Sequence, residues 1–263
     1  EVKSASPSKP VFLYIHYIDP HAPYFTADEF QPPLDRSIFQ RITVGDNNFI
    51  LNDFIRKGID PSPLIRKKDK EYLINLYDKE ISYNDRKIGE LFTQIGSLID
   101  MDKAITALTS DHGEAFLEHS DINHGHTLYD ELIRVPLIVS GPGGTAPFGK
   151  KTGYPVNNFE TMPALLNLAG IKYKTGFPNL ALLPRDKSSA TGFVTNFGKS
   201  YKYKPDETLL QGILKSKIKI VENKTLNILE MYDTAEDPKE LNDLSNSKKH
   251  AAEFRRMKTE LSK

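Results

Sequence analysis

The feature that most constrains the fold is a long amphipathic helix between short apolar runs. Residues 68–99 place their apolar side chains on one helical face. One β-rich run, at 11–17, precedes this helix in the chain, and two more, at 104–109 and 135–140, follow it. A second helix is expected over 158–169, with Gly170 as its C-terminal cap. Strands that alternate with helices predict an α/β fold with a largely parallel sheet.

The pattern changes after Pro184. Three further β-rich runs follow, at 190–198, 209–214 and 217–222. A polar, charged helix from about residue 246 to 262 closes the chain. We therefore expect two parts, a large α/β domain over 1–184 and a small α+β subdomain over 185–263.

The composition excludes several classes of function. The 263 residues include 35 Lys+Arg and 35 Asp+Glu, so the net charge gives no reason to expect nucleic acid or an anionic membrane as partner. The chain has no cysteine, which excludes a disulfide framework, a thiolate metal site and a cysteine nucleophile within it. No apolar run reaches the length of a membrane span.

Most of the histidines fall in or directly after two of the predicted strands. Six of the seven fall in two short stretches, His16 and His21, then His112, His119, His124 and His126. Ligands of α/β proteins bind just beyond the C-terminal ends of strands. In the second stretch a strand delivers Asp111 and His112 in succession, and carboxylate and imidazole are ligands for a divalent cation. The simpler interpretation of these two residues alone is a polar turn in which Asp111 caps backbone amides.

Six blocks of the sequence resemble the bacterial sulfatase family of the alkaline phosphatase superfamily, in order and in spacing. The resemblance runs over essentially the whole chain. The blocks are HYIDPHAPY at 16–24, LYDKEISYNDRKIGEL at 76–91, TSDHGE at 109–114, GHTLYDELIRVPLIVSGPG at 125–143, TMPALLNLAGI at 161–171 and EMYDTAEDPKELNDL at 230–244.

The resemblance implies a metal site and an alkaline-phosphatase-like sheet flanked by helices. Asp111 and His112 match a pair that helps to hold a divalent cation, usually calcium. Many relatives have Asn where this chain has His112, and the nitrogen ligand makes manganese or zinc the alternatives. The first acidic pair of metal ligands has no match in this chain, and we expect it upstream of residue 1.

The resemblance also implies roles for three histidines. His21 matches a residue that contacts the sulfate and protonates the leaving oxygen, which suits an imidazole. The alternative for His21 is a turn histidine that bonds to the backbone after Pro20. His126 lies where relatives hold the substrate anion, and His124, two residues away, is the alternative for that role.

The loop between these residues departs from the family pattern. Glu114 and His119 match positions that support the site rather than perform catalysis. Relatives often have glycine at the positions of Leu117 and Ser120, so we expect this loop to sit differently here.

The family nucleophile is a formylglycine made from Cys or Ser in a C/S-x-P-x-R motif, and residues 1–263 contain no such motif. We expect it upstream, with this chain as the C-terminal portion of the enzyme. The alternative is a degenerate relative that never had the motif.

The expected function is hydrolysis of a sulfate monoester on a sugar or an aryl alcohol. The first alternative is a phosphodiester or phosphonate hydrolase, or a phosphoethanolamine-type transferase, of the same superfamily. The second is a non-catalytic binding or structural piece. A periplasmic or secreted location is expected from the resemblance alone, and the sequence gives no oligomeric state.

Overall fold

The structure of the chain is a computed structural model. It describes residues 10–22, 24, 43–44, 48–49, 65–125, 127–142, 156–172, 191–198 and 208–262. The chain forms two compact units, and each is described by itself. The first comprises Glu1–Asp53 and Pro63–Ala104, and the second comprises Phe54–Ser62 and Ile105–Lys263. The domain boundary predicted at residue 184 lies outside the described residues.

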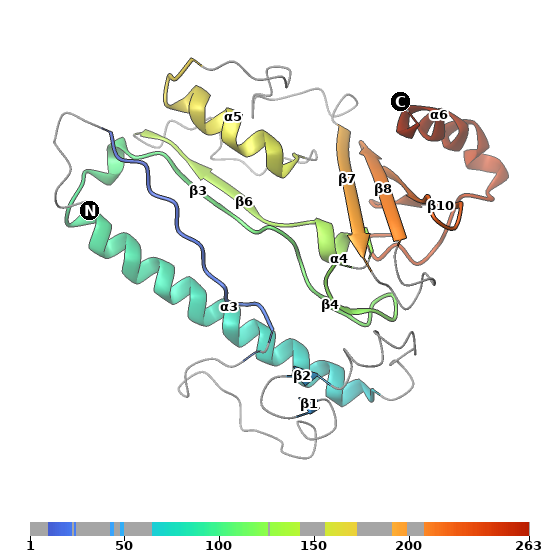
Figure 1. Ribbon diagram of the computed structural model, residues 1–263, viewed down its shortest axis with the longest axis horizontal. Coiled ribbons are helices and arrows are strands. Elements are labelled where there is room, and N and C mark those ends of the chain that lie inside the picture. Colours follow the sequence, from blue (N-terminus) through green and yellow to red (C-terminus); the bar gives the residue numbers. More distant parts are fainter. Residues whose placement is uncertain are drawn as a thin grey trace. The chain divides into compact units, whose positions relative to one another are not determined.

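A single long helix dominates the first unit. Helix α3, Lys67–Gly96, confirms the helix predicted over 68–99 (Figure 1). The carboxylate of Asp69 in its first turn accepts a hydrogen bond from the backbone N–H of Arg66 at 3.0 Å, which satisfies one unpaired donor at this end. A 3₁₀ turn, η4 (Met101–Lys103), follows the helix. The described residues of this unit also include the short strands β1 (Thr43–Val44) and β2 (Asn48–Phe49), which pair antiparallel.

The buried strand predicted over 11–17 is wrong for the structure described. These residues form no strand, and Phe12 and Tyr14 are 85% and 75% exposed. An apolar run becomes a buried strand only where neighbouring strands accept its backbone hydrogen bonds. No strand in the described part of the chain pairs with this run.

The second unit begins with the two strands predicted around the Asp-His pair. Strand β3 (Thr106–Thr109) and strand β6 (Leu137–Ser140) pair with each other, with Thr106 opposite Ser140. The pairing is antiparallel, so the largely parallel arrangement is wrong for these two strands. Between them lie the strands β4 (Ala115–Phe116) and β5 (Ile122–Asn123) and the single-turn helix α4 (Asp130–Ile133). An antiparallel pair needs no long crossover helix, and none is present between β3 and β6 in the described residues.

Helix α5, Asn158–Leu168, confirms the helix predicted over 158–169. Glu160 in its first turn accepts a hydrogen bond from the backbone N–H of Asn157 at 3.2 Å, as in a capping box. Gly170 follows with φ +69°, the left-handed conformation expected at this end of a helix.

Four antiparallel strands form the C-terminal sheet, in the order β10-β9-β8-β7. The predicted strands correspond to β7, β8 and β9, whereas the fourth strand, β10, was not predicted. The bounds are Thr191–Gly198 for β7, Thr208–Lys215 for β8, Ile218–Asn223 for β9 and Ile228–Asp233 for β10. The chain closes with the 3₁₀ turn η6 (Lys248–His250) and helix α6 (Ala251–Leu261), which lie within the helix predicted over 246–262.

The two faces of this sheet have different partners. On one face Ile213, Ile220 and Met231 form a core with Met257 of α6. Successive side chains of a strand point to opposite faces, and Val221 accordingly packs with Leu210 and with Leu128, which lies just before α4. The second face therefore supports the segment that contains α4.

No helix in the described part of the chain is long and apolar enough to cross a membrane.

Candidate functional site

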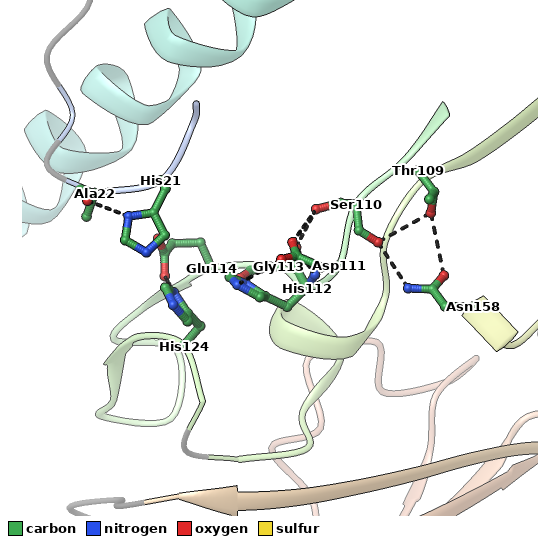
Figure 2. A network of polar contacts seen from close by, with 10 residues as sticks. All are labelled: His21, Ala22, Thr109, Ser110, Asp111, His112, Gly113, Glu114, His124 and Asn158. Atoms are coloured by element: carbon green, nitrogen blue, oxygen red, sulfur yellow. Dashed lines mark hydrogen bonds and ion pairs between the residues drawn. The ribbon is translucent and has the colours of Figure 1, made fainter. Parts of the chain in front are cut away.

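The end of strand β3 delivers the predicted Asp-His pair into a loop stabilised by hydrogen bonds (Figure 2). Ser110 Oγ donates to the carbonyl oxygen of His112 at 2.7 Å, and Asp111 Oδ1 accepts from the His112 backbone N–H at 2.9 Å. Asn158, at the start of α5, donates from Nδ2 to the carbonyl oxygen of Ser110 at 3.0 Å. The alternative turn, with Asp111 bonded to a backbone amide, is therefore present. It uses one carboxylate oxygen of Asp111.

The geometry of the pair also fits two ligands of one cation. Asp111 Oδ2 and His112 Nε2 are 3.7 Å apart, and the two side chains are 75% and 38% exposed. Two ligands that bind one metal at about 2.1–2.4 Å lie roughly 3 to 4 Å apart. His112 Nδ1 lies 2.8 Å from the carbonyl oxygen of Gly113. A carbonyl only accepts, so Nδ1 carries the proton and Nε2 keeps its lone pair, which is the usual arrangement of a metal-binding histidine.

The described residues hold only part of such a site. No group of three or more His, Cys, Asp or Glu side chains within these residues could hold a metal ion. Carboxylate and imidazole suit calcium, manganese and zinc in different degrees, and two side chains do not select among them.

Gly113 follows the pair at a point where the loop touches α4. Its backbone N–H donates to the carbonyl oxygen of Leu132 at 2.7 Å. A Cβ atom at this position would lie 2.1 Å from the carbonyl oxygen of Glu131. Only glycine fits this approach, so the DHG sequence fixes the distance between the loop and α4.

A histidine and a glutamate form the next part of the site. His124 Nδ1 lies 3.1 Å from Glu114 Oε1, and the Glu114 side chain is only 3% exposed. The His124 ring also stacks on the His112 ring, with centroids 3.9 Å apart and planes 26° apart. The hydrogen bond to Glu114 is the largest of the effects that raise the pKa of His124, and burial opposes it. The structure thus brings His124 together with Asp111 and His112, as Figure 2 shows.

His119 forms a second pair of the same kind, outside this group. Its Nδ1 lies 2.6 Å from Glu131 Oε1 and its Nε2 lies 3.1 Å from the carbonyl oxygen of Glu240. Its ring stacks on Tyr129 with a centroid distance of 3.6 Å. Both nitrogens face acceptors, which is consistent with the supporting role predicted for His119.

A buried charge cluster joins α4 to the C-terminal sheet. Lys219 Nζ of β9 lies 2.8 Å from Asp130 Oδ1 and 2.5 Å from Glu240 Oε1, and Lys219 and Glu240 are almost fully buried. Glu240 Oε2 accepts from the Asp130 backbone N–H at 2.7 Å, and Tyr129 Oη donates to Glu230 Oε2 at 3.0 Å. Burial raises the pKa of Glu240 to about 7, and Lys219 opposes this rise. The loop that carries Asp111 and His112 therefore contacts α4, and α4 in turn contacts the C-terminal sheet.

The loop between Phe116 and Asp121 contains the two positions at which the resembling sequences often have glycine, and the expectation that this loop sits differently here stays a prediction. Leu117 and Ser120 have φ values of 66° and 67°, in the left-handed region that glycine adopts most easily. The backbone conformation that a glycine would favour is thus present without one.

His21 lies in the first unit, so its expected position beside Asp111 stays a prediction. Its ring is exposed, and its Nδ1 contacts the carbonyl oxygen of Ala22 at 2.5 Å, as the turn alternative predicts. Asn84 of α3 donates from Nδ2 to the carbonyl oxygen of Asp19 at 2.8 Å, which ties this turn to the helix. Burial, followed by the charge of Asp19, raises the pKa of Glu80 in α3 to about 7.

Two further histidines complete the predicted set. His16 lies in the run predicted as a buried strand over 11–17, and it is exposed. His126 lies outside the described residues, and its role in anion binding stays a prediction.

Sequence reasoning missed two contributors. It treated Glu114 as general support and did not pair it with His124, although the DHGE block places a carboxylate ten residues before that histidine. It also missed Asn158, which bonds to the loop of the metal pair from the first turn of α5. A polar residue at the start of a helix is an expected capping signal and does not by itself indicate a second role.

Two family models match the chain. The model described as Sulfatase matches residues 1–171. The model described as N-sulphoglucosamine sulphohydrolase, C-terminal, matches residues 118–263.

Curated relatives include several sulfatases. Iduronate 2-sulfatase of Mus musculus is 28% identical over 165 residues, which cover 55% of this chain and 29% of that protein. The ulvan-active sulfatase of Formosa agariphila is 27% identical over 176 residues, which cover 66% of this chain and 31% of that protein. The chain thus spans less than a third of the length of these two relatives.

Solved structures show the same fold. A 2-O GAG sulfatase matches with a TM-score of 0.64 at 18% identity, over 86% of this chain and 55% of that one. The phosphonate monoester hydrolase of Agrobacterium radiobacter matches with a TM-score of 0.59 at 19% identity, over 74% of this chain and 42% of that one. At this identity the likeness shows the fold alone, and it confirms the predicted alkaline-phosphatase-like α/β class.

Proposed function

This chain belongs to the sulfatase family, and we propose that it supplies part of the metal and substrate site of a sulfate ester hydrolase. The observation that carries the proposal is the pair formed by Asp111 and His112. One carboxylate oxygen and one imidazole nitrogen lie 3.7 Å apart on exposed side chains at the end of a strand. The bond from His112 Nδ1 to the Gly113 carbonyl leaves Nε2 able to bind a metal.

Asp111 Oδ2 and His112 Nε2 would hold the cation, for which calcium is proposed and manganese or zinc are the alternatives. When bound, the metal would polarise a sulfate oxygen and orient the nucleophile. The other residues of this chain act on the anion and on the proton. His124 binds an anionic oxygen of the sulfate, His21 protonates the leaving oxygen, and His126 is proposed to share the binding of the anion.

The proposed nucleophile is a formylglycine from a segment that precedes residue 1 in the complete protein. Residues 1–263 contain no cysteine and no C/S-x-P-x-R serine. A covalent sulfo-enzyme mechanism requires such a group. The first acidic pair of metal ligands is proposed to come from the same segment. The support is that the described residues contain no group of three or more side chains that could hold a metal ion.

The proposed substrate is a sulfate ester of a sugar, with an aryl sulfate as the alternative. The support is the family and the named relatives, an iduronate 2-sulfatase and an ulvan-active sulfatase. A periplasmic or secreted location is proposed for the same reason.

A phosphonate or phosphodiester hydrolase is the second candidate, because His112 stands where many sulfatases have Asn. A nitrogen ligand favours manganese or zinc over calcium. A phosphonate monoester hydrolase is among the similar structures, although that likeness shows the fold alone. A phosphoethanolamine-type transferase and a non-catalytic piece are the remaining alternatives. A Thr nucleophile upstream would favour the transferase, and the lack of any nucleophile would favour the non-catalytic piece.

The test is metal-dependent turnover of 4-nitrophenyl sulfate by the complete protein, next to the 263-residue chain. We expect turnover by the complete protein alone, and a loss of at least about 100-fold in the Asp111→Ala variant, in line with removal of a transition-state contact. Phenyl phosphonate esters assayed in parallel decide between the two candidates. Equal turnover by the 263-residue chain would mean that its active site is whole and that the nucleophile has been misassigned.

A further inference from the structure

The His124 ring is held from two directions. A buried carboxylate, Glu114, meets its Nδ1 edge at 3.1 Å, and the face of the His112 ring lies against its own face. The hydrogen bond restricts rotation of the ring in its plane and the stack restricts its tilt. Because the Glu114 side chain is 3% exposed, water competes little for this bond.

A carboxylate also decides which nitrogen of a neutral imidazole carries the proton. An ionised carboxylate is an acceptor only, so the ring nitrogen that faces it is the donor. For His124 this places the proton on Nδ1 and makes Nε2 the nitrogen with a lone pair. The ring edge that carries Nε2 is then turned away from Glu114.

We propose that Glu114 is a positioning residue that fixes the tautomer and the orientation of the His124 ring through Nδ1. The inference stands on the geometry of the pair, a buried carboxylate at the Nδ1 edge and a stacked ring against the face. Only the use of His124 in the active site rests on the proposed function.

A second pair in the same unit provides a matched control. His119 and Glu131 also form a His–Glu contact through Nδ1, but there Nε2 faces the carbonyl oxygen of Glu240. This second nitrogen is already bound within the protein. A change at Glu131 should therefore affect His119 without changing the proton position on His124.

The experiment is long-range ¹H–¹⁵N spectroscopy of the histidine-labelled 263-residue chain, at a pH where the imidazoles are neutral. His124→Ala and His119→Ala identify the two sets of signals. We expect the wild-type His124 to carry its proton mainly on Nδ1. Glu114→Ala removes the acceptor and should shift the major form to the Nε2–H tautomer. Glu114→Gln keeps an amide oxygen that can accept from Nδ1–H, so it should shift the balance less. Glu131→Gln should leave His124 unchanged.

A wild-type His124 with its proton mainly on Nε2 would overturn the positioning role, whatever the variants do. The same conclusion follows if the Nδ1–H form stays the major one in Glu114→Ala. The wild-type measurement alone decides the first point, so the inference does not depend on whether the variants fold.

The tautomer is measured without turnover and without sulfate. A complete protein without sulfatase activity would refute the proposed function and leave the positioning of His124 by Glu114 standing. A wrong tautomer would refute the positioning and leave the proposed function standing, so the two failures are distinguishable.

Discussion

Gly113 determines how closely the loop that carries Asp111 and His112 approaches α4. The motif places Asp111 and His112 at the end of β3, and the glycine after them sets how closely their loop approaches α4. Its N–H bonds to the Leu132 carbonyl, and there is no room for a side chain against Glu131. A larger residue would have to push the loop or α4 away, which would move Asp111 and His112.

We predict that Gly113→Ala lowers the free energy of unfolding by about 3 kcal/mol, because the new methyl group would lie 2.1 Å from a backbone oxygen. Gly89→Ala is the control. Gly89 lies inside α3 with nothing within 4 Å of its missing Cβ. That change should raise the free energy of unfolding by about 0.5–1 kcal/mol through helix propensity. Urea denaturation of the three proteins measures both effects, and a Gly113→Ala variant as stable as the wild type would refute the close approach.

At the scale of residues, the position of the Asp111–His112 pair was easier to predict than its contacts. The pair was placed at a strand end, where ligands of α/β proteins bind. Its assignment as metal ligands came from the family resemblance and stays a prediction. The contact between Glu114 and His124 requires β4 and β5 to fold back on each other. No spacing rule predicts that geometry. The positive φ values of Leu117 and Ser120 were likewise not predictable, because Leu and Ser rarely adopt this conformation.

At the scale of elements, α4 connects the metal loop to the C-terminal sheet although it has only four residues. Such a short helix cannot be stable by itself. Tertiary contacts hold it, through the Glu230 contact of Tyr129 and the Lys219 and Glu240 contacts of Asp130. Loss of these contacts should loosen the loop that carries Asp111 and His112 as well as the helix.

We predict that Lys219→Met lowers the free energy of unfolding by about 3–5 kcal/mol, because two carboxylates stay buried without their cation. Lys215→Met is the matched control on the neighbouring strand. The ion pair between Lys215 and Glu260 is partly exposed, so its loss should cost less than about 1 kcal/mol. Thermal and urea unfolding measure the difference, and equal effects of the two variants would argue against the buried cluster as the support of α4.

Elements with a strong internal signal were predicted from the sequence, and elements that depend on neighbours were not. The helical spacing of 68–99 and the cap at Gly170 gave α3 and α5 within a few residues. The run at 11–17 has the composition of a buried strand, but hydrogen bonding and burial must come from other strands. Strand β10 was missed because Glu230 and Asp233 break its apolar pattern, and both are buried through contacts with distant residues.

At the scale of the whole molecule, the chain matches sulfatases over its full length but spans less than a third of the two curated relatives compared. In the described residues, Asp111 and His112 have a geometry that fits two ligands of one cation, and no group of three or more His, Cys, Asp or Glu side chains could hold a metal ion. These two facts have one explanation if the remaining ligands and the nucleophile belong to a segment outside residues 1–263.

This explanation predicts a difference in metal affinity. Oxygen-rich calcium sites use six to eight ligands, and weak natural sites bind at about 10⁻⁴–10⁻³ M. With two protein ligands, the 263-residue chain should bind calcium, manganese or zinc more weakly than about 10⁻³ M. The complete protein should bind one of these metals at least about tenfold more tightly, and Asp111→Ala should remove that gain. Calorimetric titration of both proteins measures the affinities. Tight binding of one metal ion per 263-residue chain, abolished by Asp111→Ala, would mean that the ligand set is complete within these residues.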